Sequence, residues 1–464
     1  MRALSTLLLM TISFFQAQGQ SAADLAGTWN GKLNFPGQSL RLVIHLNEQE
    51  DGSWTGTLDS PDQQATGIVA DEVRVNGDSL AFRIQRLRAS FQGLYQDGKI
   101  EGTFEQAGMK LPLSLAREAI EGPRRPQTPA APFPYQSEEV RFRSMDTLGL
   151  AGTLTIPAGE GPFPAVILIT GSGPQDRDET IAGHKPFWVI ADYLTRQGIA
   201  VLRYDERGVG KSDGDFSSAT SYDFSVDAEA AMDFLLARPD IDKAKIGYLG
   251  HSEGGMVAPM IAARRPEVGF LVLMAGPGVP GKEVLTSQEA EVLRQMGMPA
   301  STLDHWREAR ESVYTILAET TTESEFIQKL TSEASDILRP LSTSDKMALG
   351  VNEKNLAEKF APLASPWFRY FTLYDPAPTL QEVRCPVLAI NGGKDVQVLP
   401  ELNLSAISSA LEEGGNEQVQ VVLLPGLNHL FQPAETGMPQ EYGLIETTLD
   451  PAFLQAIGEW LSGI

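Results

Sequence analysis

Polar and apolar residues alternate with a period of two along the first quarter of the chain, from about residue 24 to residue 117. The alternation is clearest in four short segments: LRLVIHL (40–46), SWTGTL (53–58), SLAFRIQ (79–85) and KIEGTF (99–104). Asn-Gly at 76–77 and Asp-Gly at 51–52 and 97–98 are tight-turn signals. A period of two is typical of strands that bury one face. We therefore expect residues 24–118 to form a small antiparallel all-β domain, as a closed or nearly closed meander.

Proline then interrupts the pattern. EGPRRPQTPAAPFPYQ (121–136) contains five prolines, and each of them lacks an amide hydrogen and has a fixed φ. Such a segment cannot join regular structure and favours an extended, semi-rigid conformation. We interpret residues 119–136 as a linker that marks a domain boundary.

From Ser137 onward, unbroken apolar segments alternate with segments of helical spacing. The apolar segments are PAVILIT (164–170), IAVLRYD (199–205), KIGYLG (245–250), VGFLVLMAG (268–276), CPVLAING (385–392) and QVQVVLLPG (418–426). The helical segments include residues 186–198, 225–239, 256–266 and 452–461. Strands without polar alternation are buried on both faces. Residues 137–464 are therefore expected to form an α/β domain with a parallel sheet covered on both faces.

One long segment breaks this alternation. Residues 281–380 are mostly helical in spacing and rich in charge, and they lie between two predicted sheet strands. Open α/β sheets carry their sites at the carboxyl ends of the strands, so a helical insertion there is expected to form a cap over the site. Its final aromatic run, SPWFRYFTLYDP (365–376), is expected to pack in a core, with the lining of an acyl pocket as the alternative.

Charge and cysteine content exclude several kinds of partner. The formal net charge of the 464-residue chain is −23, which repels nucleic acid and anionic lipid, so we expect neither as a partner. The single cysteine, Cys385, excludes an intramolecular disulfide framework and any metal site built from several cysteines.

The N-terminus has the pattern of a secretory signal peptide. Arg2 precedes an apolar run from Leu4 to Phe15, and Ala17-Gln18-Gly19 resembles a cleavage site. The run is short for a membrane span, and no other segment is long and apolar enough to be one. We expect residues 1–19 to be removed near Gly19 and the mature chain to be secreted or periplasmic. A retained anchor is the alternative.

GYLGHSEGG (247–255) raises the question of a nucleophile. Residues 250–254 fit G-x-S-x-G, with a predicted strand before them and a predicted helix after them. A serine on so sharp a turn needs neighbours without side chains, and the glycines on either side meet that need. The helix N-terminus would direct free N–H groups at the reacting centre. We interpret Ser252 as a nucleophile, the alternative being an ordinary loop serine.

A nucleophilic serine needs a base that a carboxylate orients. His429 follows the strand at 418–426, and Asp395 follows the strand at 385–392. Ser252, Asp395 and His429 thus follow predicted strands in the chain order Ser, Asp, His. The other histidines fit the role less well. They are His45 in the β-domain, His184 near the first sheet loop, His251 held by the turn, and His305 in the cap.

These motifs together resemble the α/β-hydrolase superfamily, and within it the secreted bacterial serine esterases and serine aminopeptidase-like hydrolases. The resemblance rests on RYDERGVGKS (203–212), GHSEGG (250–255), NGGKDVQV (391–398) and GLNHLF (426–431), and covers residues 137–464. It implies an α/β-hydrolase fold with a helical cap. Some of these esterases also carry an N-terminal β-module.

The resemblance also implies an oxyanion hole made of two backbone N–H groups. Glu253, the residue after the nucleophile, would supply one. The loop GSGPQDRD (171–178) would supply the other, from Ser172 or alternatively Gly173, although Thr170-Gly171 stands where many relatives have His-Gly. The Glu253 side chain is expected to form a structural ion pair rather than act as an acid catalyst. Its candidate partners are Arg177, Lys211 and Arg203.

The sequence therefore predicts a secreted serine hydrolase that cleaves small-molecule carboxylic esters through an acyl-serine intermediate, with no metal or organic cofactor. The triad chemistry also suits amides, so a peptidase or amidase is the alternative, favoured by any acidic clamp for a substrate amino group in the cap. A non-enzymatic module, with the β-domain gripping a glycan or a partner, is a third hypothesis. The oligomeric state stays open.

Overall fold

The computed structural model describes residues 25–464 except 36–37, 64, 107 and 146. The chain divides into two compact units between Gly122 and Pro123. The expected signal peptide lies outside the described residues. Within those residues, no helix has the length and apolar character needed to cross a membrane.

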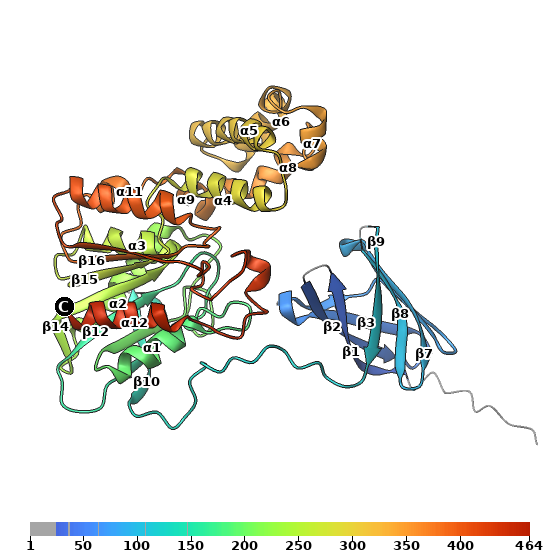
Figure 1. Cartoon of the computed structure of the whole chain (residues 1–464), viewed down its shortest axis with the longest axis horizontal. Coiled ribbons are helices and arrows are strands. Elements are labelled where there is room, and N and C mark those ends of the chain that lie inside the picture. Colours follow the sequence, from blue (N-terminus) through green and yellow to red (C-terminus); the bar gives the residue numbers. More distant parts are fainter. Residues whose placement is uncertain (1–24, 36–37, 64, 107, 146) are drawn as a thin grey trace, which may run out of the picture. The chain divides into compact units, whose positions relative to one another are not determined.

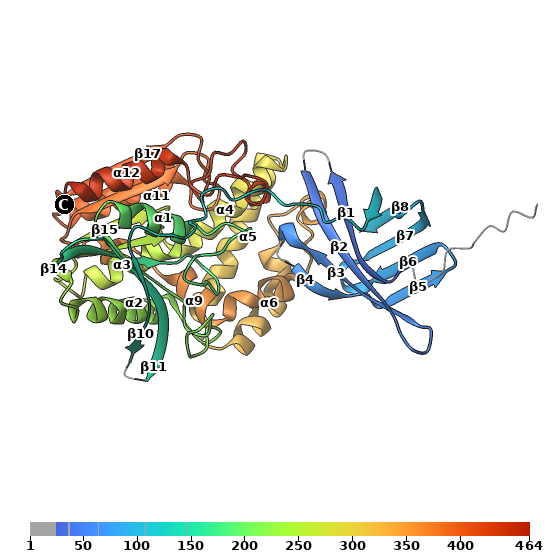
Figure 2. The same ribbon diagram turned by 90° about the horizontal axis from the view of Figure 1, so that it is seen from below.

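The first unit is a single antiparallel sheet of nine strands (Figure 2). The strands are β1 (Gly27–Phe35), β2 (Gln38–Glu48), β3 (Trp54–Ser60), β4 (Ala65–Val69), β5 (Glu72–Asn76), β6 (Ser79–Ile84), β7 (Ala89–Gln96), β8 (Lys99–Gln106) and β9 (Met109–Ala116). β1 pairs with β2 on one side and with β9 on the other, and β4 and β5 are the two edge strands of the sheet. Alternate residues such as Leu80, Phe82 and Ile84 fill its core. The expected antiparallel all-β fold is confirmed.

The second unit begins with a proline-rich segment that packs against later loops of the same unit. Residues 117–135, all of them described, form neither helix nor strand. The Arg125 guanidinium donates to the backbone carbonyls of Ala182, Gly443 and Ile445. The Gln127 side chain accepts from the backbone N–H groups of Thr448 and Leu449 and donates to the Leu449 carbonyl. These contacts fasten residues 123–135 to loops of the second unit.

The second unit contains an eight-stranded sheet in the order β10-β11-β13-β12-β14-β15-β16-β17. Its strands are β10 (Gln136–Ser144), β11 (Leu148–Ile156), β12 (Phe163–Ile169), β13 (Ala200–Tyr204), β14 (Ile241–His251), β15 (Phe270–Met274), β16 (Val387–Gly392) and β17 (Val419–Leu424). The six strands from β12 to β17 are parallel, as expected. β10 and β11 add an antiparallel hairpin at one edge of these parallel strands. β10 has exposed positions along much of its length, so it has no apolar run to reveal it.

Helices cover both faces of this sheet (Figure 1). α1 (Pro186–Arg196) and α12 (Pro451–Ser462) pack on one face, around a core that includes Val166, Leu168 and Val272. α2 (Ser221–Leu236), α3 (Glu253–Ala262) and α11 (Pro400–Glu413) pack on the other. The central strands are buried on both faces, which is why they read as unbroken apolar runs.

A helical cap is inserted between β15 and β16, as expected. It comprises α4 (Gly281–Gln295), α5 (Ala300–Glu319), α6 (Glu323–Ile337), α7 (Thr343–Ala348), α8 (Leu356–Phe360), α9 (Pro366–Leu373) and α10 (Ala377–Leu380). Figure 1 shows α5 to α8 stacked beyond α4 and α9. Trp306, Val313 and Phe326 belong to an apolar cluster of the cap's own. The insertion leaves the sheet at the carboxyl end of β15, the edge at which β14 delivers Ser252.

Candidate active site

Ser252 occupies a strained turn between β14 and α3. Its φ is +53° and its ψ −118°, a conformation that residues with side chains rarely adopt. A Cβ at Gly250 would lie 2.0 Å from the Gly254 carbonyl oxygen, and a Cβ at Gly254 would lie 2.1 Å from that of Ile169. Only glycine therefore fits at either position. α3 begins at Glu253, so the free N–H groups of its first turn lie beside Ser252.

His429 and Asp395 form a buried pair. Nδ1 of His429 lies 2.8 Å from Oδ2 of Asp395, and both side chains are almost fully buried. The other oxygen, Oδ1, accepts from the backbone N–H groups of Gln397 and Val398 at 2.8 and 3.0 Å. These bonds hold the carboxylate in one orientation. Because a carboxylate accepts, Nδ1 of His429 carries the proton, and Nε2 is left as the basic nitrogen.

His251 connects the serine turn to this pair. Its Nε2 donates to the His429 carbonyl at 3.1 Å, and the two imidazole rings lie 4.8 Å apart between centroids. The hydrogen bonds among the described residues include none from the Ser252 hydroxyl to His429. The structure thus joins Asp395 directly to His429. Ser252 is linked to them through its neighbour in sequence, His251, whose side chain is bonded to the His429 carbonyl.

The loop after β12 lies against the serine and carries both candidate oxyanion donors. A Cβ at Gly171 would lie 3.2 Å from the Ser252 Cβ. The Gly171 N–H already donates to Oε1 of Glu179 at 2.7 Å, so it is occupied. Among the described residues, the N–H groups of Ser172 and Gly173 donate to no protein acceptor. Both remain available for an oxyanion, together with the N–H of Glu253.

The Glu253 side chain does not form the expected ion pair. It accepts from the Ser221 hydroxyl at 2.6 Å and from Nε1 of Trp367, on cap helix α9, at 2.8 Å. The three expected partners pair elsewhere: Arg177 with Asp205 and Glu139, Arg203 with Asp178, and Lys211 with Glu139. Burial raises the pKa of Glu253, and hydrogen bonds from Ser221, Trp367 and Ser172 oppose that rise only in part. Burial beneath the cap therefore favours the neutral form of this carboxyl.

The remaining histidines have structural contacts away from the serine. His184 is buried between the Thr448 hydroxyl and the Tyr442 carbonyl, and burial together with the nearby Arg125 charge lowers its pKa to about 4. His45 pairs with Asp59 in the β-domain, and His305 lies 3.6 Å from Asp345 in the cap.

Glu179 is a residue at this site that the sequence does not reveal. It is fully buried, and its Oε1 lies 2.8 Å from Nδ1 of His251, 72 residues away. It follows Asp176, Arg177 and Asp178 in a charged loop, and no spacing sets it apart from its neighbours.

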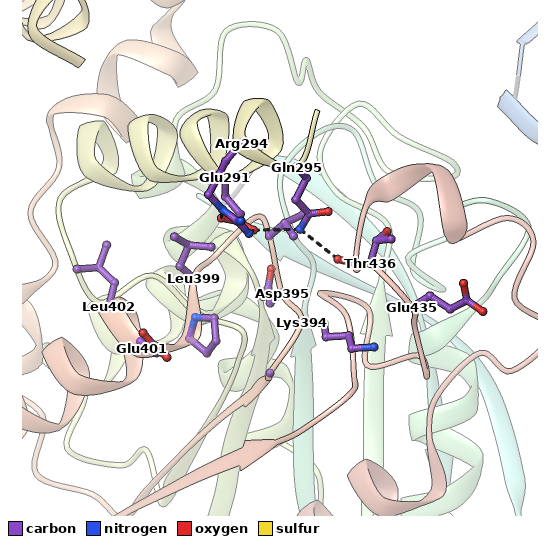
Figure 3. Close-up of a pocket in the computed structure, with 13 residues that line it drawn as sticks. Glu291, Arg294, Gln295, Lys394, Asp395, Leu399, Glu401, Leu402, Glu435 and Thr436 are labelled. Atoms are coloured by element: carbon purple, nitrogen blue, oxygen red, sulfur yellow. Dashed lines mark hydrogen bonds and ion pairs between the residues drawn. The ribbon is translucent and has the colours of Figure 1, made fainter. Parts of the chain in front are cut away.

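A cavity of about 530 Å³ lies beside the loop that carries Asp395 (Figure 3). Its walls are residues 393–396, the start of α11, cap helix α4 and residues 435–436. The Gln295 side chain crosses from α4 to the Thr436 carbonyl at 3.3 Å. Glu291 is paired with Arg294, so it is not a free acidic clamp. Among the described residues, no cluster of three or more His, Cys, Asp or Glu side chains could hold a metal ion.

Residues 187–435 match the profile of the serine aminopeptidase, S33 family. The chain is 29% identical over 370 residues to esterase EstD of Thermotoga maritima, which covers 79% of this chain and 74% of that protein. It is 33% identical over 148 residues to polyketide transferase claH of Penicillium crustosum, across 32% of this chain and 46% of that protein. A solved esterase of Pyrococcus furiosus aligns with 74% of this chain and 97% of its own, with 14% identity and a TM-score of 0.42.

Proposed function

The chain belongs to the serine aminopeptidase, S33 family of α/β-hydrolases, and from that premise we propose that it cleaves carboxylic esters through an acyl-serine intermediate on Ser252. Two observations support the proposal: Ser252 lies on a strained strand-to-helix turn, and the residue before it, His251, is bonded to the His429 carbonyl of the buried Asp395–His429 pair. The similarity to esterase EstD, which extends over most of both chains, supports esters as the substrates.

In the proposed acylation step, His429 and the backbone N–H groups near Ser252 act together. Nε2 of His429 accepts the hydroxyl proton while Oγ of Ser252 attacks the ester carbonyl carbon. The resulting oxyanion accepts hydrogen bonds from the N–H of Glu253 and from that of Ser172 or Gly173. When the tetrahedral intermediate collapses, the C–O bond to the alcohol breaks, and His429 returns the proton to the departing oxygen.

Deacylation repeats these steps with water as the nucleophile. His429 accepts a proton from water, which attacks the acyl carbon, and then protonates Oγ of Ser252 as the acid leaves. Asp395 accepts from Nδ1 throughout, which keeps Nε2 basic and stabilises the imidazolium in each step.

The alternative is cleavage of amides, for which the family's description and two acidic residues that line the cavity, Glu401 and Glu435, are the supporting observations. A panel of nitrophenyl esters of rising acyl length, assayed beside aminoacyl nitroanilides, decides between the two. The proposal expects kcat/KM for the best ester to exceed that for every nitroanilide. A higher kcat/KM for a nitroanilide than for every ester would contradict the esterase proposal and support an aminopeptidase.

We also propose that the enzyme acts outside the cytoplasm, because residues 2–19 have the pattern of a signal peptide. N-terminal sequencing of the protein isolated from its host should start near Gln20. An intact Met1 on a cytoplasmic product would contradict export.

A further inference from the structure

Glu179 and His251 form a second carboxylate–histidine pair beside the first. Both side chains are almost fully buried, and Oε1 of Glu179 lies 2.8 Å from Nδ1 of His251. Nε2 of His251 faces the His429 carbonyl, which can only accept. With an acceptor at each nitrogen, His251 is suited to carry both protons and a positive charge. Burial alone would lower its pKa, but the Glu179 carboxylate and the His429 carbonyl outweigh burial and raise it.

The conformation of Glu179 is costly. Its φ of +51° is in the left-handed region, which a residue with a long side chain seldom occupies. Its Oε2 is buried and finds no hydrogen-bond partner among the described residues. Strain and an unsatisfied buried oxygen both reduce stability, so stability alone does not account for a glutamate here.

The pair touches the three segments that meet at the reaction centre. Oε1 of Glu179 accepts from the Gly171 N–H at 2.7 Å, at the start of the loop of residues 171–178 that carries Ser172 and Gly173, hereafter the oxyanion loop. His251 immediately precedes Ser252, and its Nε2 donates to the backbone of His429. Oε1 of Glu179 therefore bonds both the oxyanion loop, at Gly171, and the serine turn, at His251. Through His251 it also fixes the backbone of His429, the proposed base.

Resting on the function proposed above, we infer that Glu179 and His251 are positioning residues for Ser252, His429 and the oxyanion loop. The charge of Glu179 is essential to this role, since it keeps a proton on each nitrogen of His251. Beside a glutamine, a neutral His251 has only one N–H. If Nδ1 carries it, the bond from Nε2 to the His429 carbonyl is lost. If Nε2 carries it, the glutamine must turn its amide N–H toward Nδ1, and the Gly171 N–H loses the oxygen that accepts from it.

Glu179→Gln tests the inference because glutamine keeps the size of the side chain and removes the charge. We expect kcat for the best nitrophenyl ester to fall by about 10²-fold, as a displacement of about 1 Å at a reaction centre can produce. KM should stay within about twofold, because the pair touches catalytic groups rather than bound substrate. The rate of Ser252 labelling by a fluorophosphonate should fall with kcat.

Two further variants separate positioning from general destabilisation. Asp227→Asn removes the charge of another buried carboxylate, which is bonded to Arg207 at 2.7 Å rather than to Glu179 or His251. It should lower Tm and leave kcat within about twofold of the wild type. His251→Gln should lower kcat as Glu179→Gln does, and the double variant should lose little more, because the two residues act as one unit. His251→Gln also serves as the test if Glu179→Gln does not fold.

The outcomes distinguish this inference from the proposed function. If wild-type Ser252 is labelled and a folded Glu179→Gln or His251→Gln variant is labelled and turns over at the wild-type rate, the positioning inference is wrong and the nucleophile stands. An equal loss of kcat in Asp227→Asn would also overturn it. If wild-type Ser252 is not labelled, the proposed function fails and the inference fails with it.

Discussion

The Asp395 carboxylate lies 2.8 Å from Nδ1 of His429, and two backbone N–H groups hold its other oxygen. Asp395→Asn keeps an oxygen for those N–H groups but can place an amide N–H against His429, which favours the tautomer with a protonated Nε2. We expect kcat to fall by about 10⁴-fold while the fold is retained. Steady-state kinetics and circular dichroism measure the two effects.

Asp345→Asn is the matched control, because Asp345 also lies beside a histidine, His305, but in the cap. It should keep kcat near the wild-type value. A loss of activity in Asp345→Asn comparable to that in Asp395→Asn would contradict the assigned role of Asp395.

Glu253 is predicted to serve through its backbone, with a side chain that only needs to accept hydrogen bonds. Burial raises the pKa of this carboxyl, so a neutral glutamine is close to its preferred state. Glu253→Gln should keep activity within about tenfold and change the free energy of unfolding by less than about 1 kcal/mol.

Glu253→Ala provides the contrast. It would leave the Ser221 hydroxyl and the Trp367 indole N–H without an acceptor, at about 1–3 kcal/mol for each unsatisfied group. Chemical denaturation compares the two variants. If Glu253→Gln loses activity as completely as a triad variant does, the carboxyl acts as a catalytic acid after all.

How much the sequence predicts depends on whether a feature is local. Ser252, Asp395 and His429 could be singled out because each follows a strand that its own apolar run reveals, and the structure places Asp395 against His429; their catalytic roles stay predictions. The partners of Glu253 could not be predicted. Trp367 is 114 residues away, on a cap helix whose docking depends on tertiary packing. The role of Glu179 could not be predicted for the same reason, since its contact with His251 spans 72 residues.

The pH dependence of stability should reflect His184. Burial and the Arg125 charge lower its pKa to about 4, against an ordinary value of 6.5. Below pH 6.5 the unfolded chain therefore binds a proton that the folded chain does not, so the stability from the neutral histidine is complete above pH 6.5 and is lost as the pH falls toward 4. The slope for one proton is at most about 1.4 kcal/mol per pH unit.

Urea unfolding of the wild type and of His184→Gln between pH 4 and pH 8 isolates this contribution from that of the carboxylates. The stability advantage of the wild type over the variant should shrink as the pH is lowered. An advantage that stays constant over the whole range would rule out the assigned state of His184.

The proline-rich segment predicts where the catalytic unit can be cut. A chain of residues 123–464 keeps the bonds of Arg125 and Gln127 to the loops at 182 and 443–449. A chain of residues 137–464 leaves those backbone groups without their partners. We expect both to fold and hydrolyse short esters, with a lower Tm for the shorter chain. Equal Tm values would mean that the segment adds nothing to the unit, and an inactive 123–464 chain would mean that the β-domain completes the site.

The most direct test of the account is covalent labelling of the full chain by a fluorophosphonate, followed by mass spectrometry of the labelled peptide. The label should sit on Ser252. Ser252→Ala should abolish labelling and lower ester hydrolysis by roughly 10⁴–10⁶-fold, because triad members act as a unit. Ser172→Ala, which alters an exposed serine of the neighbouring loop and keeps its backbone N–H, should retain the label. Label on another serine, or undiminished hydrolysis by Ser252→Ala, would contradict the central claim that Ser252 is the nucleophile.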